Sequence, residues 1–289
     1  EPAFTSGFPV DFGIYHGDVS SSNDNRLSTR LTQGLTLFTD STDDELAGTS
    51  WQFDYNTGFL SSGGSGAFAT MWRRAPKYFD IVCYDGNNTS GRTVAHSLGV
   101  VPEMIWIKNR GFTAGEDWAV YHKGINAGTD PEDYFLRLNT NGAQANNAGN
   151  FNDTAPTSTV FTVGNDRRTN GNVADGNKYI AFLFATLAGV SKVGSYTGNG
   201  STQNIDCGFS NGAKFVLIKR TDASENWHVF DSTRGINAGD DPALRLDTDV
   251  AEFNSAAINP HSAGFQVEQS ASCNNNINSA NYIFYAVAA

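Results

Sequence analysis

The sequence is poor in positive charge and in long apolar runs, and each deficit argues against a class of partner. Lysine and arginine together number 19 against 30 aspartates and glutamates, so the formal net charge is −11. Nucleic acids and anionic membranes attract proteins through clustered basic side chains, so neither is an expected partner. No apolar run reaches the ~18 residues that a transmembrane helix requires, so we expect no membrane insertion.

Cysteine is also scarce. The three cysteines, Cys83, Cys207 and Cys273, are too few and too scattered for a disulfide framework or a zinc site. We expect buried free thiols, with a Cys207–Cys273 bridge as the alternative.

Motifs of catalysis are missing as well. A nucleophilic site needs a nucleophile beside a base, and the chain has neither a nucleophile elbow nor an HExxH motif. The histidines do not recur at equivalent places, since His122 is matched by Asp231 in the second copy of the repeat described below. We therefore expect no enzymatic activity and no cofactor, although paired carboxylates of the kind that hydrolyse glycosides stay open as an alternative.

What the chain has in quantity is glycine, aromatic residues and small polar residues. It contains 30 glycines and 20 phenylalanines, and only 17% of its residues are charged. Turns rich in Gly and Asn between aromatic or β-branched strands are typical of an all-β protein.

A repeated five-residue word organises the sequence. Gly-Ile-Asn-Ala-Gly occupies residues 124–128 and returns at 235–239. Each copy follows a Trp-containing strand pattern and precedes first Asp-Pro and then Leu-Arg-Leu. An ordered series of this kind indicates a tandem repeat, which decides the architecture.

Within the repeats, alternating apolar patterns predict about seven short strands separated by turn signals, which is typical of a β-sandwich or jelly roll. In the middle repeat these patterns lie at 79–84, 92–96, 103–108, 117–121, 134–139, 160–163 and 179–184. We therefore predict an all-β chain of tandem jelly-roll-like, lectin-like sandwich domains, with no amphipathic helix.

Three domains are expected: 1–77, 78–187 and 188–289. The first is a degenerate or truncated copy, because 7–15 parallels 99–107 but no first hairpin precedes it. We expect this copy to be trimmed, or its sheet to be completed by another chain or by the neighbouring repeat. The linkers are short, which favours a rod or an arc of domains.

Two pairs of side chains are candidates for ligand binding. Trp118 and Trp227 would suit sugar stacking if exposed, and core packing is the alternative that we favour. Arg137 and Arg245 each stand between two leucines, so alternation places them on the opposite face of a strand. There they could bind a ligand or, as we favour, form salt bridges with the acidic loops 129–133 and 240–241.

Those acidic loops are also candidates for calcium, because Asp130, Asp133, Asp240 and Asp241 supply the hard oxygen ligands that this ion takes. Turn and capping roles are the default interpretation.

Five stretches of the sequence resemble a known family. Residues 71–82, 92–105, 117–122, 154–164 and 176–181 are similar to segments of tandem-repeat virion structural proteins of marine tailed phages, described as tail-fibre-like or lectin-like. The similarity is strongest across 70–186 and looser in 1–69 and 188–289. The last repeat departs from the pattern at 206–208, where Asp-Cys-Gly replaces Ala-His-Ser.

The resemblance implies a function without catalysis. Such a protein would be part of a virion, would assemble with other virion proteins as a homo-oligomer, with a trimer as the natural guess, and would contact host surface glycans through its loops. A capsid decoration protein without a ligand is the first alternative. A polysaccharide-degrading tail spike is the second.

Overall fold

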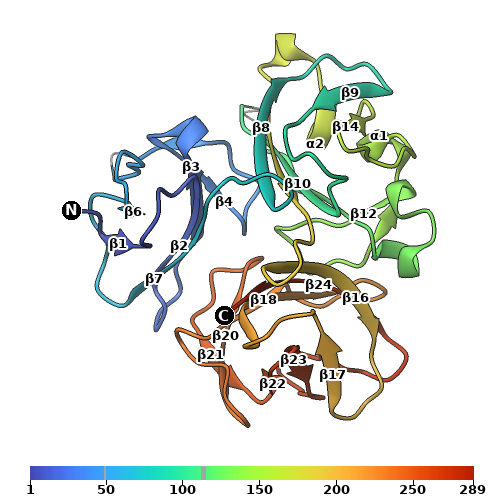
Figure 1. The fold of residues 1–289 in the computed structure, drawn as a ribbon. Helices are drawn as coiled ribbons and strands as arrows, with labels where there is room; N and C mark the ends of the chain where they lie inside the picture. Colours follow the sequence, from blue (N-terminus) through green and yellow to red (C-terminus); the bar gives the residue numbers. More distant parts are fainter. Residues whose placement is uncertain (49, 112–114) are drawn as a thin grey trace.

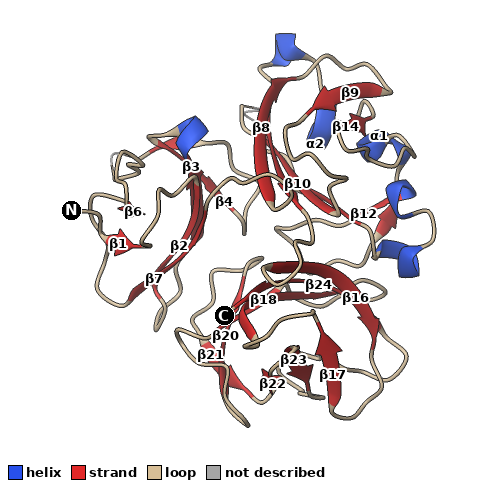
Figure 2. Cartoon of the chain, in the orientation of Figure 1, coloured by secondary structure: helices blue, strands red, loops and turns tan. Residues whose placement is uncertain are grey.

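The computed structural model of the chain describes all residues except 49 and 112–114. The predicted all-β class is confirmed, because 24 strands and only short helical turns occur in the described part. The helices are α1 (Ala148–Phe151), α2 (Arg167–Asn170), η1 (Arg30–Thr32), η2 (Ile125–Gly128), η3 (Pro131–Asp133) and η4 (Val173–Asp175). Most of them lie at the periphery (Figure 2), whereas α2 packs against β10 (Met104–Asn109). None of the described helices is long and apolar enough to cross a membrane.

The first large sheet has five antiparallel strands in the order β5-β4-β3-β2-β7. A pairing of β1 with β6 forms its small second layer. The strands are β1 (Phe4–Thr5), β2 (Phe12–Asp18), β3 (Asn25–Thr29), β4 (Leu35–Phe38), β5 (Leu46–Ala47), β6 (Gly58–Phe59) and β7 (Ala67–Trp72).

The second large sheet has four antiparallel strands in the order β11-β10-β15-β8. Two strand pairs, β9 with β14 and β12 with β13, accompany it. The strands are β8 (Phe79–Asp85), β9 (Arg92–Ala95), β10 (Met104–Asn109), β11 (Ala119–His122), β12 (Tyr134–Phe135), β13 (Ala145–Asn146), β14 (Val160–Val163) and β15 (Lys178–Phe184). The strand expected at 134–139 is therefore short, and beyond it Leu136 makes only an isolated bridge to Val120.

The third large sheet has six antiparallel strands in the order β16-β24-β18-β19-β20-β21, with β17-β23-β22 as its second layer. The strands are β16 (Ser191–Thr197), β17 (Gln203–Asp206), β18 (Ala213–Arg220), β19 (His228–Asp231), β20 (Asp241–Arg245), β21 (Phe253–Ser255), β22 (Ile258–His261), β23 (Gly264–Val267) and β24 (Asn281–Ala288).

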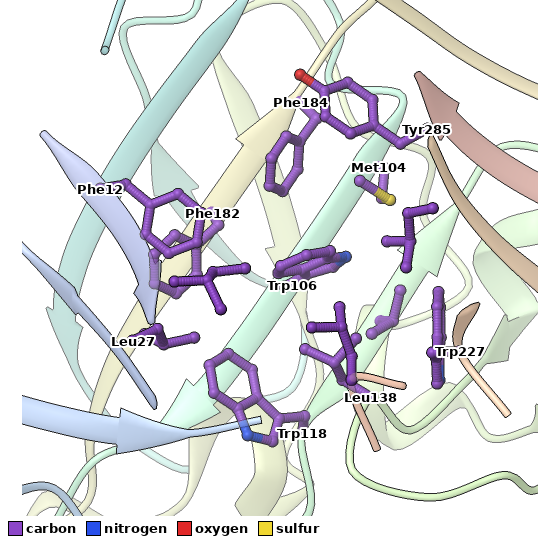
Figure 3. Packing of buried hydrophobic residues seen from close by; sticks show 14 of the residues in the cluster. Phe12, Leu27, Met104, Trp106, Trp118, Leu138, Phe182, Phe184, Trp227 and Tyr285 are labelled. Atoms are coloured by element: carbon purple, nitrogen blue, oxygen red, sulfur yellow. The ribbon is translucent and has the colours of Figure 1, made fainter. Parts of the chain in front are cut away.

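The three large sheets surround a single central core (Figure 1). Buried side chains from all three meet there, among them Phe12 and Leu27 of the first sheet, Trp106 of the second and Tyr285 of the third (Figure 3). The arrangement has approximate threefold symmetry and is closed, since the first sheet contacts the third. The expectation of a rod or an arc is therefore wrong.

Each sheet is apolar on both faces, which explains the long apolar strands. In β10, Met104 and Trp106 face the central core, whereas Ile105 and Ile107 face a separate outer core. This follows from the alternation of side chains along a strand. The outer layers of the first and third sheets cover outer cores of the same kind.

Candidate functional site

Both tryptophans proposed as sugar platforms are fully buried in the central core, with exposed fractions of 0% for Trp118 and 1% for Trp227. Each indole nitrogen donates to a backbone carbonyl of the preceding repeat. Trp118 Nε1 bonds to Phe38 O at 2.8 Å, and Trp227 Nε1 bonds to Arg137 O at 2.8 Å. No face of either ring is open to a sugar, so their role is structural.

Asn25 occupies the tryptophan position in the first repeat and closes the ring. Its Nδ2 donates to Arg245 O and to Thr248 O of the third repeat, each at 2.8 Å. Asn25 is equivalent to the two tryptophans because, in all three repeats, the backbone N–H at this position bonds to the side chain of an Asp or Asn. That acceptor is Asp40 for Asn25, Asn139 for Trp118 and Asp247 for Trp227. Each repeat thus donates to the one before it, and the first donates to the third.

Two buried lysines strengthen the same contacts. Lys108 Nζ donates to Thr42 O of the first repeat at 2.9 Å and to Glu116 O at 2.6 Å. Lys219 Nζ donates to Asn141 O of the second repeat at 3.2 Å. Burial lowers the pKa of each ammonium to about 8, because a low-dielectric environment disfavours the charged form.

The two arginines also serve the structure. Arg137 Nε pairs with Asp117 Oδ2 at 2.7 Å, and the Arg245 guanidinium lies 4.7 Å from the centre of the Phe253 ring. The favoured salt bridge is present for Arg137, but its predicted partner, the loop 129–133, is wrong. Asp117 stands immediately before Trp118, so this pair stabilises the entry to the Trp strand.

The predicted calcium loops place their aspartates in or beside turns, and two of them accept hydrogen bonds from the protein. Asp241 is fully buried and accepts the backbone N–H of Asn237 at 2.7 Å, while Asp240 accepts Asn254 Nδ2 at 3.2 Å. Asp130 precedes a 3-10 turn with a left-handed backbone and makes no capping hydrogen bond with its side chain, and Asp133 lies within that turn. Across the described residues, no group of three or more His, Cys, Asp or Glu side chains could hold a metal ion.

The repeated pentapeptide proves to have two different structures. Ile125 is buried in the central core, whereas Ile236 is half-buried at the edge of the third outer core. Both repeats have an equivalent turn before this point, in which a backbone N–H bonds to the side chain two residues earlier. Gly124 N bonds to the side chain of His122 as Thr233 N bonds to that of Asp231. Gly124 is therefore structurally equivalent to Thr233, and the second copy of the pentapeptide begins two residues later, at Gly235.

All three cysteines are free, so the alternative of a Cys207–Cys273 bridge is wrong. Cys207 and Cys273 are buried, as expected, and burial raises the pKa of both thiols to about 12. Cys83 is exposed and does not fit the expectation of a buried thiol.

The structure contains a hollow of about 490 Å³ at one end of the third sandwich. Its lining is more apolar than polar in area, and its polar side chains are those of Ser210, Asn211, Ser232, His261 and Ser262. The buried Nδ1 atom of His261 has no hydrogen-bond partner among the described residues. Hydroxyl, amide and imidazole groups set in an apolar surface suit a neutral ligand that carries both hydroxyl groups and an apolar face. The sequence offered no signal for this site, because its residues come from four separate parts of the chain, 210–213, 232–236, 260–264 and Ala289.

Fold and interior define the class of protein: an all-β chain of three antiparallel sheets closed around one core. A family model described as "Domain of unknown function (DUF7483)" matches residues 18–289, and the chain belongs to this family. No curated protein and no solved structure matches the chain.

Proposed function

We propose that the protein is a non-catalytic structural component of a phage virion, of the tail-fibre or adhesin type. The observation that carries the proposal is the closed ring of contacts made by Asn25, Trp118 and Trp227. This ring joins three diverged repeats into one body and leaves their connecting loops outside. The family resemblance of the sequence supports the virion location.

Contact with host glycans would be made at the hollow of the third repeat. Its serine and asparagine side chains can exchange hydrogen bonds with sugar hydroxyls, and an open, shallow site of this size supports only weak binding. Weak sites become effective when several copies bind together. A homo-oligomer on the particle would provide that multiplicity.

Gold-labelled antibody against the protein, imaged on intact particles, tests the location. Label at the tail tip is the expected result, whereas label over the head would favour the decoration alternative and overturn the adhesin proposal. Purified protein should also block adsorption of the phage to its host. Release of reducing sugar from host polysaccharide would contradict the non-catalytic role.

A matched pair of variants tests the hollow. Ser262→Arg places a long side chain in the hollow, and Ser201→Arg places the same side chain at an exposed turn elsewhere in the third repeat. Glycan binding, measured on immobilised host polysaccharide, should fall at least ten-fold in the first variant only. Equal binding by both variants would remove the hollow from the proposal.

A further inference from the structure

The first sheet differs from the other two at one edge. In the second sheet β8 pairs with β15 over seven residues, and in the third β16 pairs with β24 over seven residues. In the first sheet, β7 takes the place of β15 and β24, and it pairs with β2 on one side. No described strand pairs with its other side. The place occupied by β8 and β16 is thus vacant beside β7.

The side chains of β7 are less buried than their equivalents. Phe68 pairs across the sheet with His16 as Ile180 pairs with Lys108 and Ile283 with Lys219. Ile180 and Ile283 are fully buried, but Phe68 is only half-buried. Thr70, Ala69 and Met71 are half-buried as well. The partial exposure of these side chains is consistent with the absence of a neighbouring strand beside β7.

A second surface borders the vacancy. In the second repeat, the turn at Gly124 packs against β16, because a Cβ on this glycine would lie 2.6 Å from Ser195 Cβ. The equivalent turn of the third repeat lies beside β7, where the Arg234 guanidinium stands 5.0 Å from the centre of the Phe68 ring. There Thr233 is exposed, whereas Gly124 is buried. The turn at Thr233 is therefore exposed in the third repeat, whereas the equivalent turn at Gly124 in the second repeat is covered by β16.

We propose that the free edge of β7 is a strand-acceptor site. An extended segment of a different protein pairs with β7 antiparallel and continues the sheet. Backbone hydrogen bonds to an exposed edge supply affinity, and side chains at alternate positions supply specificity. The segment must carry apolar residues at every second position, as β8 does with Phe79 and Ile81, which both face the central core. The proposal does not depend on the virion function.

The chain itself provides a segment with which to test the site. In the third repeat, β16 leads through a hairpin into β17, and β17 corresponds to β1 of the first repeat. Gly7 and Gly208 mark the register, because each has a positive φ and lies two residues after the last residue of its strand. A copy of residues 191–202 fused directly before Pro2 therefore enters the vacant place in register.

Hydrogen exchange read by mass spectrometry and NMR is the measurement. In the unextended protein, amides of β7 should exchange faster than those of β15 and β24. The extension should slow exchange in β7 at least ten-fold and raise the urea midpoint. A control extension carries Asp at the copies of Val193 and Tyr196, which face the two cores, and should do neither.

Two outcomes would overturn the proposal. The first is equal exchange in β7 with either extension. The second is protection of β7 in the unextended chain that increases with protein concentration, together with dimers in sedimentation, because a second copy would then be the occupant. Neither outcome depends on a variant that fails to fold, since both extensions leave residues 2–289 intact.

Discussion

Trp227 Nε1 donates a hydrogen bond to Arg137 O across 90 residues of sequence, at 2.8 Å. The donor belongs to the third repeat and the acceptor to the second, and the indole is buried in the central core. Separation of the two repeats would leave a carbonyl unpaired and expose an indole. We therefore expect the repeats to unfold together in one transition.

The first prediction isolates that hydrogen bond. Trp227→Phe keeps an aromatic ring but leaves Arg137 O without its donor. Trp106→Phe is the matched control, since Trp106 is equally buried and its Nε1 has no partner among the described residues. An unpaired buried acceptor costs about 1–3 kcal/mol, so Trp227→Phe should lose about that much more unfolding free energy than the control in urea. Equal losses would mean that this bond adds no stability.

The second prediction concerns acid. Gly124 N donates to His122 Nδ1 at 2.9 Å, so the ring proton lies on Nε2 and is donated to Phe284 O of the third repeat. Burial lowers the pKa of His122 from 6.5 to about 3. Between these values the unfolded chain binds more protons, so stability falls as the pH drops, by up to about 1.4 kcal/mol per pH unit.

The variant His122→Asn has no proton to bind in this range. Its unfolding free energy, measured by urea titration from pH 7 to 4, should fall less steeply than that of the wild type. Identical slopes would show that His122 does not contribute to acid sensitivity.

The third prediction concerns alkali. Burial lowers the pKa of Lys108 from 10.5 to about 8. Between pH 8 and 10.5 the unfolded chain binds more protons, so this group makes stability rise with pH. Thiols and tyrosines with raised pKa values act in the opposite direction, so the difference between variants is the useful quantity. Relative to Lys108→Met, the wild type should gain up to about 1.4 kcal/mol per pH unit in this range.

Lys178 provides the control, because it is exposed at the start of β15. Lys178→Met should follow the wild type at every pH. A Lys108→Met curve parallel to both would contradict a buried ammonium.

The fourth prediction uses a substitution that the chain already contains. Asp247 accepts the N–H of Trp227, and Asn139 does the same for Trp118. Burial raises the pKa of Asp247 from 3.8 to about 6, so the folded state binds more protons in that range and stability falls as the pH rises through it.

Asp247→Asn keeps the acceptor and removes the buried charge. At pH 7 it should therefore be more stable than the wild type, by up to about 3 kcal/mol, and the reciprocal Asn139→Asp should be less stable. Thermal unfolding at pH 4 and pH 7 measures both. A less stable Asp247→Asn at pH 7 would show that attraction to Lys219 and Arg245 outweighs the burial.

The β class could be predicted because alternation and turn residues are local signals. The closed arrangement could not. In β10, Ile105 and Trp106 are both apolar, and nothing local shows that one faces an outer core and the other the centre. The inner face is determined by what packs against it, and those partners lie in other repeats.

The candidate site was predicted poorly for a related reason. The favoured burial of Trp118 in a core is confirmed, but the bond of its polar atom to Phe38 O, 80 residues away, could not be predicted. The hollow beside His261 gathers ordinary residues that have no shared pattern. Identical sequence did not predict identical structure either, since the two copies of Gly-Ile-Asn-Ala-Gly place Ile125 and Ile236 in different cores.

The closed ring formed by Asn25, Trp118 and Trp227 bears on how such a protein can diverge. A ring of three identical subunits shows the same loop at every corner, and a mutation alters all three corners together. Here each corner is one of the three repeats and has its own stretch of sequence, so one repeat can change its loops while the other two keep the ring intact. The selectable unit is then the single corner, whereas the unit that folds is the whole triad.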